Sequence, residues 1–511
     1  MKKILLSLIL GTSLLSQAQE TTSNDGLRYA LNNLTGTARF RGMSGAFGAL
    51  GGDLSAINVN PAGSLFFSNN YASLSASLYN VHNRSDYFGT RTKANMSTLD
   101  LNQIGAVLIF NDASEKNNWS KIAFALNYDN TNDFDTKVFS AGTNPSQSID
   151  QYFLNKAQGL PVEYVTLQNN ESISDLYMYL GETSGLGFPA QQAMMAYQAY
   201  LIESEGPDSY FSNVNHIGGD FDQENYITAT GYNGKLSANL ATSYKNRLFL
   251  GMNLNAHFTD YVKASTVFES NDNALFSSGY TATAQQFDNE LYTYGTGFSL
   301  NLGAIVKISD AFRAGIAYES PTWYRLTDEL TQRLIVNTTD GTENFQEVIA
   351  PNVVNLYPAY KIQTPSKITY SGAIIFNKKG LLSIDYAMKD YSNIKFKPTN
   401  DSFYSNLNSQ MNQQFKNAYE LRIGGEYKIN KWSIRGGYRF EESPYKLTSA
   451  MSDLIGYSGG LGYNFGESKL DFAFANDRRS QQIAFISSGM TDAAQVRTSN
   501  NNVTVTYSIY F

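Results

Sequence analysis

The sequence contains no cysteine and only three histidines among its 511 residues. Without cysteine, the fold is not stabilised by disulfide bonds and holds no thiolate metal site. Charged residues make up only 16% of the chain, and its formal net charge is −7. A net negative charge argues against nucleic acid as a partner, so we expect no nucleic-acid partner.

Long apolar segments are also missing. Beyond residue 15, no stretch of the sequence approaches the ~20 consecutive apolar residues of a transmembrane helix. The mean hydropathy of −0.32 would suit a soluble protein. That inference fails for β-barrels, because each strand of a barrel carries only one apolar face. The content of 35 Tyr, 31 Phe and 40 Gly favours a barrel.

The N-terminus has the pattern of an export signal. Lys2 and Lys3 precede a short apolar segment, residues 4–15, and Ser16-Gln17-Ala18 then places small residues two positions apart. These features predict a signal peptide, residues 1–18, that is cleaved before Gln19. The apolar segment is too short to anchor the chain in a bilayer. The alternative is a buried N-terminal helix.

Apolar and polar residues alternate with a period of two over most of the chain beyond residue 70, which is typical of β-strands. In residues 432–441, one face is apolar and the other carries Arg435 and Arg439. An arginine that faces lipid near the bilayer midplane costs ~2–4 kcal/mol. We therefore expect the polar faces of these strands to line a lumen.

This alternation predicts an all-β fold, a transmembrane antiparallel β-barrel of about fourteen strands. The predicted strands are 70–82, 98–110, 119–134, 225–244, 247–268, 286–308, 311–327, 365–377, 380–396, 415–429, 431–444, 454–466, 468–480 and 500–511. Short turns alternate with long connections, as expected when short periplasmic turns alternate with longer external loops. The long connections are 83–97, 135–224, 269–285, 328–364, 397–414 and 481–499.

The connection 135–224 is too long for a simple loop. Within it, residues 191–203 have a helical composition with few helix-breaking residues. We expect a partly helical extracellular insertion here. Its Met and Tyr residues could cap the barrel mouth and contact an apolar ligand, or the helix could pack only on its own loop.

A different segment, residues 19–69, precedes the barrel, residues 70–511. It is rich in Gly, Ala and Ser and contains GMSGAFGALGGDLSAINVNPAG at 42–63. Small residues permit close backbone packing and sharp turns, so this segment could fold into the lumen as a plug. From these properties alone, it could equally be a periplasmic tail.

Three motifs in this segment resemble the FadL/TodX family of outer-membrane channels for long-chain fatty acids and other hydrophobic compounds. They are Arg41 to Phe47, Gly52 to Ala56 and Asn60-Pro61-Ala62-Gly63. Similar patches recur at 297–321 and 421–444, so the resemblance spans nearly the whole mature chain. The NPA motif at Asn60 is the most specific of these features.

The resemblance implies a Gram-negative outer-membrane barrel of fourteen strands with an N-terminal hatch that carries the motif residues Gly42, Gly45, Asn60, Pro61 and Ala62. It implies passive uptake of a hydrophobic small-molecule ligand, with release through a side opening near a kinked third strand, where the polar segment 127–133 lies. We expect a monomer that contacts outer-membrane lipid. The terminal aromatic Phe511 would be an assembly signal for the barrel-assembly machinery. The insertion 135–224 and the loop 328–364 depart from the family pattern, which leaves the ligand undefined.

The polar faces of the predicted strands contain charges of both signs. The expected lumen residues are Arg313, Glu319, Asp385, Lys389, Arg422, Glu426, Arg435, Arg439, Glu441 and Asp471. Such a set suits salt-bridge ladders that stiffen the wall and hold the plug. Alternatively, an arginine receives a ligand carboxylate, which a guanidinium group matches in bidentate fashion. Arg422, Arg435 and Arg439, with His257 on a neighbouring lumen face, are the candidates for ligand binding.

Enzymatic and metal-binding motifs are weak. Gly456-Tyr457-Ser458-Gly459-Gly460 fits GxSxG, but that motif requires a sharp strand-to-helix turn and lies here within a predicted strand. Asp220, Asp222 and Glu224 alternate in a loop that could bind Ca²⁺ or simply be solvated. We predict no enzyme activity and no cofactor. A phospholipase-like barrel is the enzymatic alternative.

The leading functional interpretation is a channel for hydrophobic small molecules, with long-chain fatty acids as its cargo. The alternative is a PorV-like barrel that serves protein secretion or surface attachment through its extracellular loops. A TonB-dependent receptor has about 22 strands and a larger plug, so the chain length excludes it. Diffusion of water-soluble solutes is disfavoured if the hatch fills the lumen.

Overall fold

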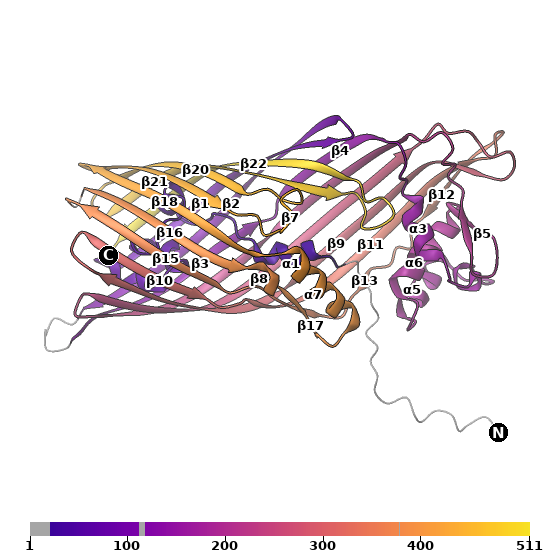
Figure 1. The fold of residues 1–511 in the computed structure, drawn as a ribbon. Helices are drawn as coiled ribbons and strands as arrows, with labels where there is room; N and C mark the ends of the chain where they lie inside the picture. The colour runs from indigo at the N-terminus through magenta and orange to yellow at the C-terminus, as the bar shows by residue number, and fades with distance from the viewer. Residues whose placement is uncertain (1–20, 112–117, 378) are drawn as a thin grey trace, which may run out of the picture.

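The computed structural model describes residues 21–111, 118–377 and 379–511. These residues form a closed antiparallel β-barrel, drawn on its side in Figure 1. The predicted signal peptide, residues 1–18, lies outside the described residues, and its cleavage stays a prediction. None of the helices in the described part of the chain is long and apolar enough to cross a membrane.

The barrel wall is built from twenty strand segments within the described residues. They are β1 (Tyr71–Tyr87), β2 (Thr90–Asn111), β3 (Trp119–Asp133), β4 (Thr136–Asn144), β7 (Phe221–Tyr244), β8 (Leu248–Ser270), β9 (Thr281–Lys307), β10 (Phe312–Glu319), β11 (Trp323–Thr339), β12 (Asn344–Ile349), β13 (Asn355–Leu356), β14 (Tyr360–Gln363), β15 (Lys367–Phe376), β16 (Gly380–Asp390), β17 (Lys395–Lys397), β18 (Asn417–Ile429), β19 (Trp432–Glu441), β20 (Leu454–Asn464), β21 (Ser468–Ala484) and β22 (Ala493–Tyr510). Four strands are interrupted, namely β3 with β4, β10 with β11, β12 to β15, and β16 with β17. The described segments therefore make fourteen strands, and the predicted number is confirmed.

The last strand closes the barrel against the first. Tyr510 pairs with Tyr71, and the backbone N–H of Phe511 donates to the carbonyl of Asn70 at 3.1 Å. Along β22 the outward residues from 505 to 509 are 41–51% exposed, whereas the alternating inward residues from 504 to 508 are at most 1% exposed. This confirms the predicted lipid and lumen faces. The role of Phe511 as an assembly signal stays a prediction.

Several predicted loops are wrong because the strands continue beyond the membrane. The predicted loop 83–97 is a hairpin in which β1 and β2 turn at Phe88 and Gly89. Parts of 269–285, 328–364 and 481–499 are also strands. Above the bilayer both faces of a strand can be polar, so the alternation that marks a strand inside the membrane is lost. Within 397–414 the structure has the helix α7 (Ser402–Gln414).

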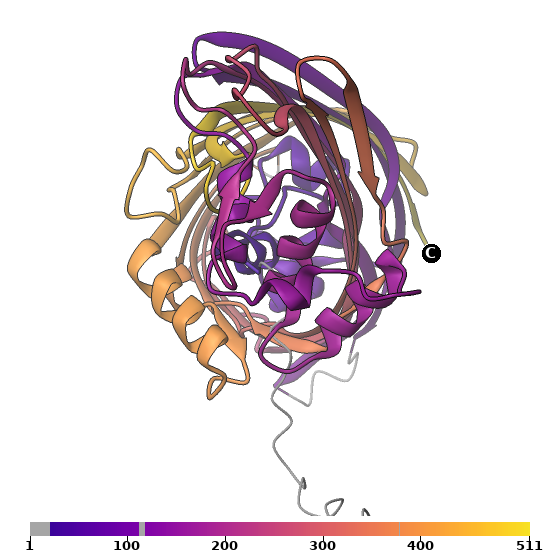
Figure 2. The same ribbon diagram turned by 90° about the vertical axis from the view of Figure 1, so that its right-hand side faces the viewer.

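The insertion forms a packed cap over the barrel mouth. The ends of the predicted loop 135–224 belong to the wall, as β4 and the start of β7, and residues 145–220 fold into the cap (Figure 2). Its elements are α3 (Asp150–Ala157), α4 (Val162–Val165), α5 (Ile173–Glu182), α6 (Gly187–Gln198), β5 (Ile202–Ser204) and β6 (Tyr210–Ser212). The helix predicted at 191–203 is observed at 187–198. Its buried Met194 and Met195 share an apolar core with Phe287 and Leu334 of the wall, so the cap is joined to the barrel.

The segment before β1 lies inside the lumen and not in the periplasm. It contains α1 (Ser23–Ala30), α2 (Ala38–Gly42), η1 (Ser55–Asn58) and η2 (Pro61–Phe66), and another short helix, η3 (Tyr391–Asn393), follows β16. Nearly every residue from 38 to 66 is buried. Hydrogen bonds join this segment to β1, β3, β16, β20 and β22 on different sides of the barrel. We call residues 21–69 the hatch.

Candidate functional site

The hatch motif begins at Asn60, which caps η2. The Asn60 Oδ1 atom accepts a hydrogen bond from the backbone N–H of Ala62 at 3.1 Å, and Pro61 occupies the first helical position. The Nδ2 group donates to the Gly48 carbonyl at 2.8 Å and, more weakly, to backbone carbonyls of β9 and β10. One side chain thus closes the hatch on itself and fixes it to the wall.

The wall receives the hatch at inward-facing glycines. A Cβ atom at Gly303 would lie 2.0 Å from the Asn60 Oδ1 atom, and one at Gly251 would lie 2.4 Å from the carbonyl carbon of Pro61. Gly251 and Gly303 are cross-strand partners on β8 and β9. Any larger residue at either position would overlap the NPA motif, so these glycines form one half of a seat for the hatch.

A second glycine pair lies in β18 and β19. Gly424 and Gly437 are cross-strand partners, and a Cβ atom on either would lie 2.5 Å from the Met43 backbone. Gly42 and Gly45 complete the fit from the hatch side. Gly42 approaches the backbone of β20, and Gly45 has a φ of 76°, which favours glycine. The four glycines Gly251, Gly303, Gly424 and Gly437 are hereafter called the hatch seat.

Carboxylates of the wall accept hydrogen bonds from backbone and side-chain amide groups of the hatch. Asp385 of β16 accepts hydrogen bonds from the N–H groups of Phe47 at 2.9 Å and Gly48 at 3.0 Å. Asp129 of β3 accepts a hydrogen bond from Asn58 Nδ2 at 2.6 Å. Both carboxylates are buried at 2% exposure, so each of these bonds is shielded from water.

A buried ion network continues this attachment. Glu426 of β18 binds Arg39 of the hatch at 2.9 Å and Arg435 of β19 at 2.6 Å. Arg435 also binds Asp471 of β21 at 2.7 Å, and Asp471 binds Lys469 at 3.0 Å. The network therefore links three strands of the wall to the hatch. Each of the ten predicted lumen residues contacts the hatch or another lumen residue, which confirms their predicted orientation.

The wall is interrupted beside the hatch. The ladder between β2 and β3 ends at the pair Gln103 and Asp129. Just beyond it, between Asn130 and Asn132, the pairing of β3 with its other neighbour, β7, shifts register. In the described residues no backbone ladder joins the outer half of β2 to β4. The backbone of β4 pairs with β7, and β4 also contacts β2 and β1 through side-chain hydrogen bonds of Thr92 and Asn83. Leu99 of β2 is 76% exposed at this place, whereas Leu78 on the fully paired β1 is 41% exposed. We call this interruption the β2–β4 gap.

The hatch lies directly behind the β2–β4 gap. Asn132 Oδ1 accepts a hydrogen bond from the N–H of Asn33 at 2.8 Å, and Asn132 Nδ2 donates to the Leu31 carbonyl at 2.7 Å. On the other side, Asn102 of β2 donates to the Gly36 carbonyl at 3.1 Å. Residues 31–36 of the hatch therefore bridge β2 and β3 just beyond the point at which the ladder between these two strands ends.

The cap is held to the barrel by a polar cluster above the membrane. Glu269 of β8 joins the cap to the barrel, because it accepts a hydrogen bond from the Ile149 N–H at 3.1 Å, and beside it, within the cap, Asp150 of α3 contacts His216 at 3.0 Å. The hydrogen bond to Asp150 raises the pKa of His216 above its ordinary value. Burial would raise the pKa of Asp150, but the hydrogen bond and the charge of His216 hold it below the ordinary value.

Comparison with known proteins identifies the family of this plugged barrel. The family described as outer membrane protein transport protein (OMPP1/FadL/TodX) matches residues 216–509. The chain belongs to this family. It is therefore an outer-membrane channel for hydrophobic compounds, and not an enzyme. No curated protein matches the chain.

Two solved structures of this family have the same fold. A FadL homologue of Pseudomonas aeruginosa is 12% identical with a TM-score of 0.54, and the match covers 94% of this chain and 100% of that one. The toluene transporter TodX of P. putida is 14% identical with a TM-score of 0.52, over 94% of this chain and 99% of that one. At these identities the likeness concerns the fold alone.

In this FadL/TodX family channel, the four candidate ligand-binding residues do not lie together in one site. Arg435 and Arg439 have side chains at most 3% exposed, and both are bonded to wall carboxylates. Arg422 binds Glu420 and also lines a small lumen cavity of about 40 Å³. His257 lies elsewhere, on β8, where it contacts Ser299 at 2.8 Å. Only Arg422 among the four lines this cavity.

The GxSxG match and the acidic loop at 220–224, which resembled an enzyme motif and a Ca²⁺ site, contain side chains that form hydrogen bonds within the protein. Ser458 lies inside β20, and its hydroxyl contacts Ser44 of the hatch at 2.8 Å, so the GxSxG match contributes to hatch attachment. Asp222 accepts a hydrogen bond from Thr143, and Glu224 accepts one from Tyr226. Among the residues that the structure describes, no three His, Cys, Asp or Glu side chains gather as a metal site.

Proposed function

We propose that this channel takes up long-chain fatty acids and similar hydrophobic molecules, and releases them sideways through the β2–β4 gap. The observation that carries the proposal is the missing ladder between β2 and β4 directly beside the hatch. An apolar molecule that leaves sideways does not have to cross the polar lumen. Leu99 and Leu101, exposed on β2, would guide an apolar chain from this gap to lipid.

The hatch is placed to control this route. Residues 31–36 contribute the bonds from Asn33 and Gly36 to both sides of the gap, so a shift of this segment would break the contacts that bridge β2 and β3. Each such hydrogen bond contributes only ~0.5–1.5 kcal/mol. Ligand binding in the lumen could therefore supply enough free energy to move residues 31–36 while the hatch seat keeps the rest of the hatch in place.

The small lumen cavity offers a place for a carboxylate. Its lining contains the cations Lys367, Lys389 and Arg422 and Asn32 of the hatch, and it also contains the carboxylates Glu420, Glu441 and Glu442. A fatty-acid carboxylate that replaced Glu420 on Arg422 would contact the residue next to Asn33. This supports a fatty acid as the ligand, and the name of the P. putida relative, a toluene transporter, supports an apolar cargo.

Uptake of labelled long-chain fatty acid tests this function. A deletion strain without paralogues should take up several-fold less label than the same strain carrying the wild-type gene. Equal uptake in the two strains would contradict the proposal. Toluene uptake, measured in parallel, distinguishes a fatty-acid channel from one for neutral apolar compounds.

A crosslink between β2 and β3, at the inner end of the β2–β4 gap, tests the exit in the same assay. Asp100 of β2 and Asn130 of β3 contact each other, and the native chain contains no cysteine that could interfere. With cysteine at both positions, oxidation should reduce uptake to the level of the deletion strain, and reduction should restore it. Either single-cysteine variant is the control. Full uptake in the oxidised double variant would exclude this exit.

Arg422→Ala should lower fatty-acid uptake several-fold at equal barrel abundance, because the cavity then loses its guanidinium group. Toluene uptake should change little, since toluene carries no carboxylate. Arg333→Ala is the matched control, because Arg333 lies on the outside of the wall and pairs with Asp288. Unchanged fatty-acid uptake by Arg422→Ala would remove Arg422 from the binding site.

One observation favours a second function. The cap exposes large apolar side chains, including Tyr179, Tyr200 and Ile217, the last at 80% exposure. Such residues suit contact with another protein, as in a PorV-like barrel for secretion or surface attachment. Co-purification of a secreted protein that depends on the cap, without any fatty-acid uptake, would favour this alternative.

A further inference from the structure

A basic surface lies on the outside of the barrel, just above its lipid-facing belt. On β21 the outward residues Phe472 and Phe474 are 45% exposed, and the next outward positions are Asn476 and Arg478. The same change occurs on the neighbouring strand, where Arg497 of β22 lies above the apolar outward face. The lipid-facing surface thus ends in a row of cations on the extracellular side.

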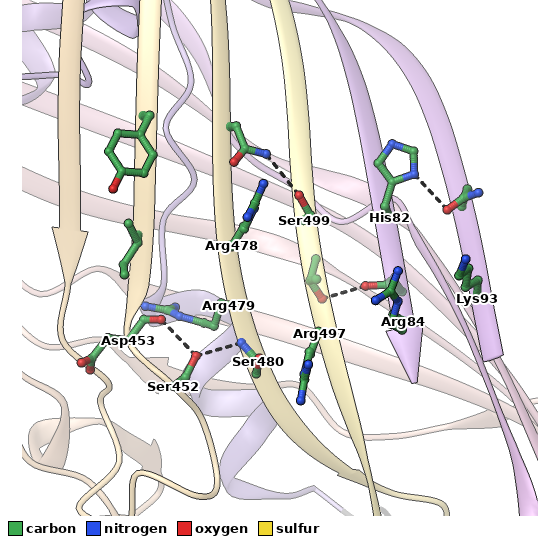
Figure 3. A pocket seen from close by; sticks show the side chains of 16 residues that line it. His82, Arg84, Lys93, Ser452, Asp453, Arg478, Arg479, Ser480, Arg497 and Ser499 are labelled. Carbon is green, nitrogen blue, oxygen red and sulfur yellow. Dashed lines mark hydrogen bonds between the residues drawn. The ribbon is translucent and has the colours of Figure 1, made fainter. Parts of the chain in front are cut away.

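These cations surround a concave surface of about 940 Å³, formed by β1, β2, β20, β21 and β22 (Figure 3). Its outward lining includes His82, Arg84, Lys93, Arg478, Arg497 and Ser499. A smaller hollow of about 70 Å³ adjoins it and adds Arg91 and Asp86. Together the two hollows are lined by six guanidinium or ammonium groups and two carboxylates. We call them the outer basic groove.

Three of these cations are unpaired within the part of the chain that the structure describes. None of the described residues forms an ion pair or a side-chain hydrogen bond with Arg84, Lys93 or Arg478. Arg435 and Arg439, in contrast, are bonded to carboxylates inside the barrel. The excess of positive charge is also local, because the whole chain carries a net charge of −7. An unbalanced set of this kind attracts an external anion.

We propose that the outer basic groove binds the phosphate groups of an anionic lipid in the outer leaflet. Arg478 lies four residues beyond Phe474, which corresponds to ~13 Å along the strand and ~10 Å along the membrane normal at the usual tilt. The polar headgroup layer begins at the end of the apolar belt and is ~5–8 Å thick. A long arginine side chain can reach back into that layer.

The groove also matches the geometry of a phosphate. Guanidinium groups bind phosphate oxygens through paired hydrogen bonds, and Arg84, Arg478 and Arg497 come from three different strands around one hollow. Ser499 lies between them on β22 and supplies a hydroxyl group. The acyl chains of the same lipid would continue downward over the exposed faces of Phe472 and Phe474.

Lipid retention by the purified full-length protein tests this site. The protein is delipidated in detergent, mixed with diphosphoryl lipid A, and examined by native mass spectrometry. The wild-type protein should retain the lipid, and the triple variant Arg84→Gln, Arg478→Gln, Arg497→Gln should retain at least roughly tenfold less, because three charge-assisted contacts are lost. The control variant Lys245→Gln, Lys431→Gln removes exposed charge at the periplasmic turns and should retain the lipid as the wild type does.

Two further binding measurements identify the chemical group that the groove recognises. Dephosphorylated lipid A should bind no better to the wild type than to the triple variant, and inorganic phosphate at the same concentration should not displace the intact lipid. Heat-dependent gel mobility checks that each variant is a folded barrel. Equal lipid retention by the folded triple variant, or equal binding of the dephosphorylated lipid, would overturn the proposal. Stronger retention of a soluble polyanion than of lipid A would also overturn it.

Discussion

Gly437→Leu is expected to displace the hatch around Met43 and to make the channel leaky. A Cβ atom at position 437 would already lie 2.5 Å from the Met43 carbonyl carbon and 2.6 Å from the Ser44 nitrogen. These atoms belong to the backbone and cannot rotate away as a flexible side chain can. Overpacking of this kind costs ~1–3 kcal/mol, which corresponds to a roughly 5- to 150-fold rise in the displaced population.

The leak can be measured directly. In planar bilayers, the Gly437→Leu channel should show steady ion conductance where the wild type is mostly closed. Cells that produce it should become sensitive to large hydrophilic antibiotics. Gly436→Leu is a control one residue away, because position 436 faces outward and has nothing within 4 Å of a Cβ atom. If both variants conduct equally, the hatch does not depend on the hatch seat.

The number and order of the strands could be predicted from sequence because alternation within the membrane is a local property. A strand such as residues 432–441 shows both faces in its own sequence, whatever it pairs with. The outer extensions could not be predicted in this way. Residues 136–144 form β4 only because they pair with β7, about eighty residues later, and in water neither face of β4 has to be apolar.

The site was predictable to a smaller extent. The polar faces placed Arg435 and Glu426 in the lumen, and the structure confirms this. The glycine seat was missed, although Gly251 and Gly303 both lie at inward positions of their strands. Their role depends on a pairing between β8 and β9 and on the path of Pro61, more than two hundred residues before Gly303. Inward glycines at matching positions of adjacent strands are the pattern that could have shown it.

The same dependence on distant partners explains why the sequence could not distinguish the candidate ligand-binding arginines from one another. From sequence, Arg422, Arg435 and Arg439 were equivalent, since each lies on a polar strand face. The structure distinguishes them by their surroundings, because Arg435 is enclosed by Glu426 and Asp471 whereas Arg422 lines a cavity. Loss of Arg435 should therefore affect stability, and loss of Arg422 should affect uptake.

Arg435→Met is expected to lower the free energy of unfolding by about 3–5 kcal/mol, because it removes one partner from a buried ion network. Glu426 and Asp471 would stay buried, balanced by Arg39 and Lys469 and, at the longer distance of 4.0 Å, by Lys428. Methionine keeps most of the side-chain volume, so the loss would reflect charge and not a cavity. Urea unfolding in detergent, followed by the gel mobility of the folded barrel, measures the difference.

An ion pair on the outside of the barrel provides the comparison. It shows whether the expected loss of stability arises because the charges are buried or from the loss of any ion pair. Arg333 binds Asp288 at 2.6 Å, but its side chain is 49% exposed, so Arg333→Met should cost only about 0–1 kcal/mol. Adding Asp471→Asn to Arg435→Met should restore part of the lost stability, because it neutralises one of the two carboxylates left without Arg435. If Arg435→Met costs no more than Arg333→Met, the network does not hold the hatch, and the hatch seat and the Asp385 hydrogen bonds must carry that role.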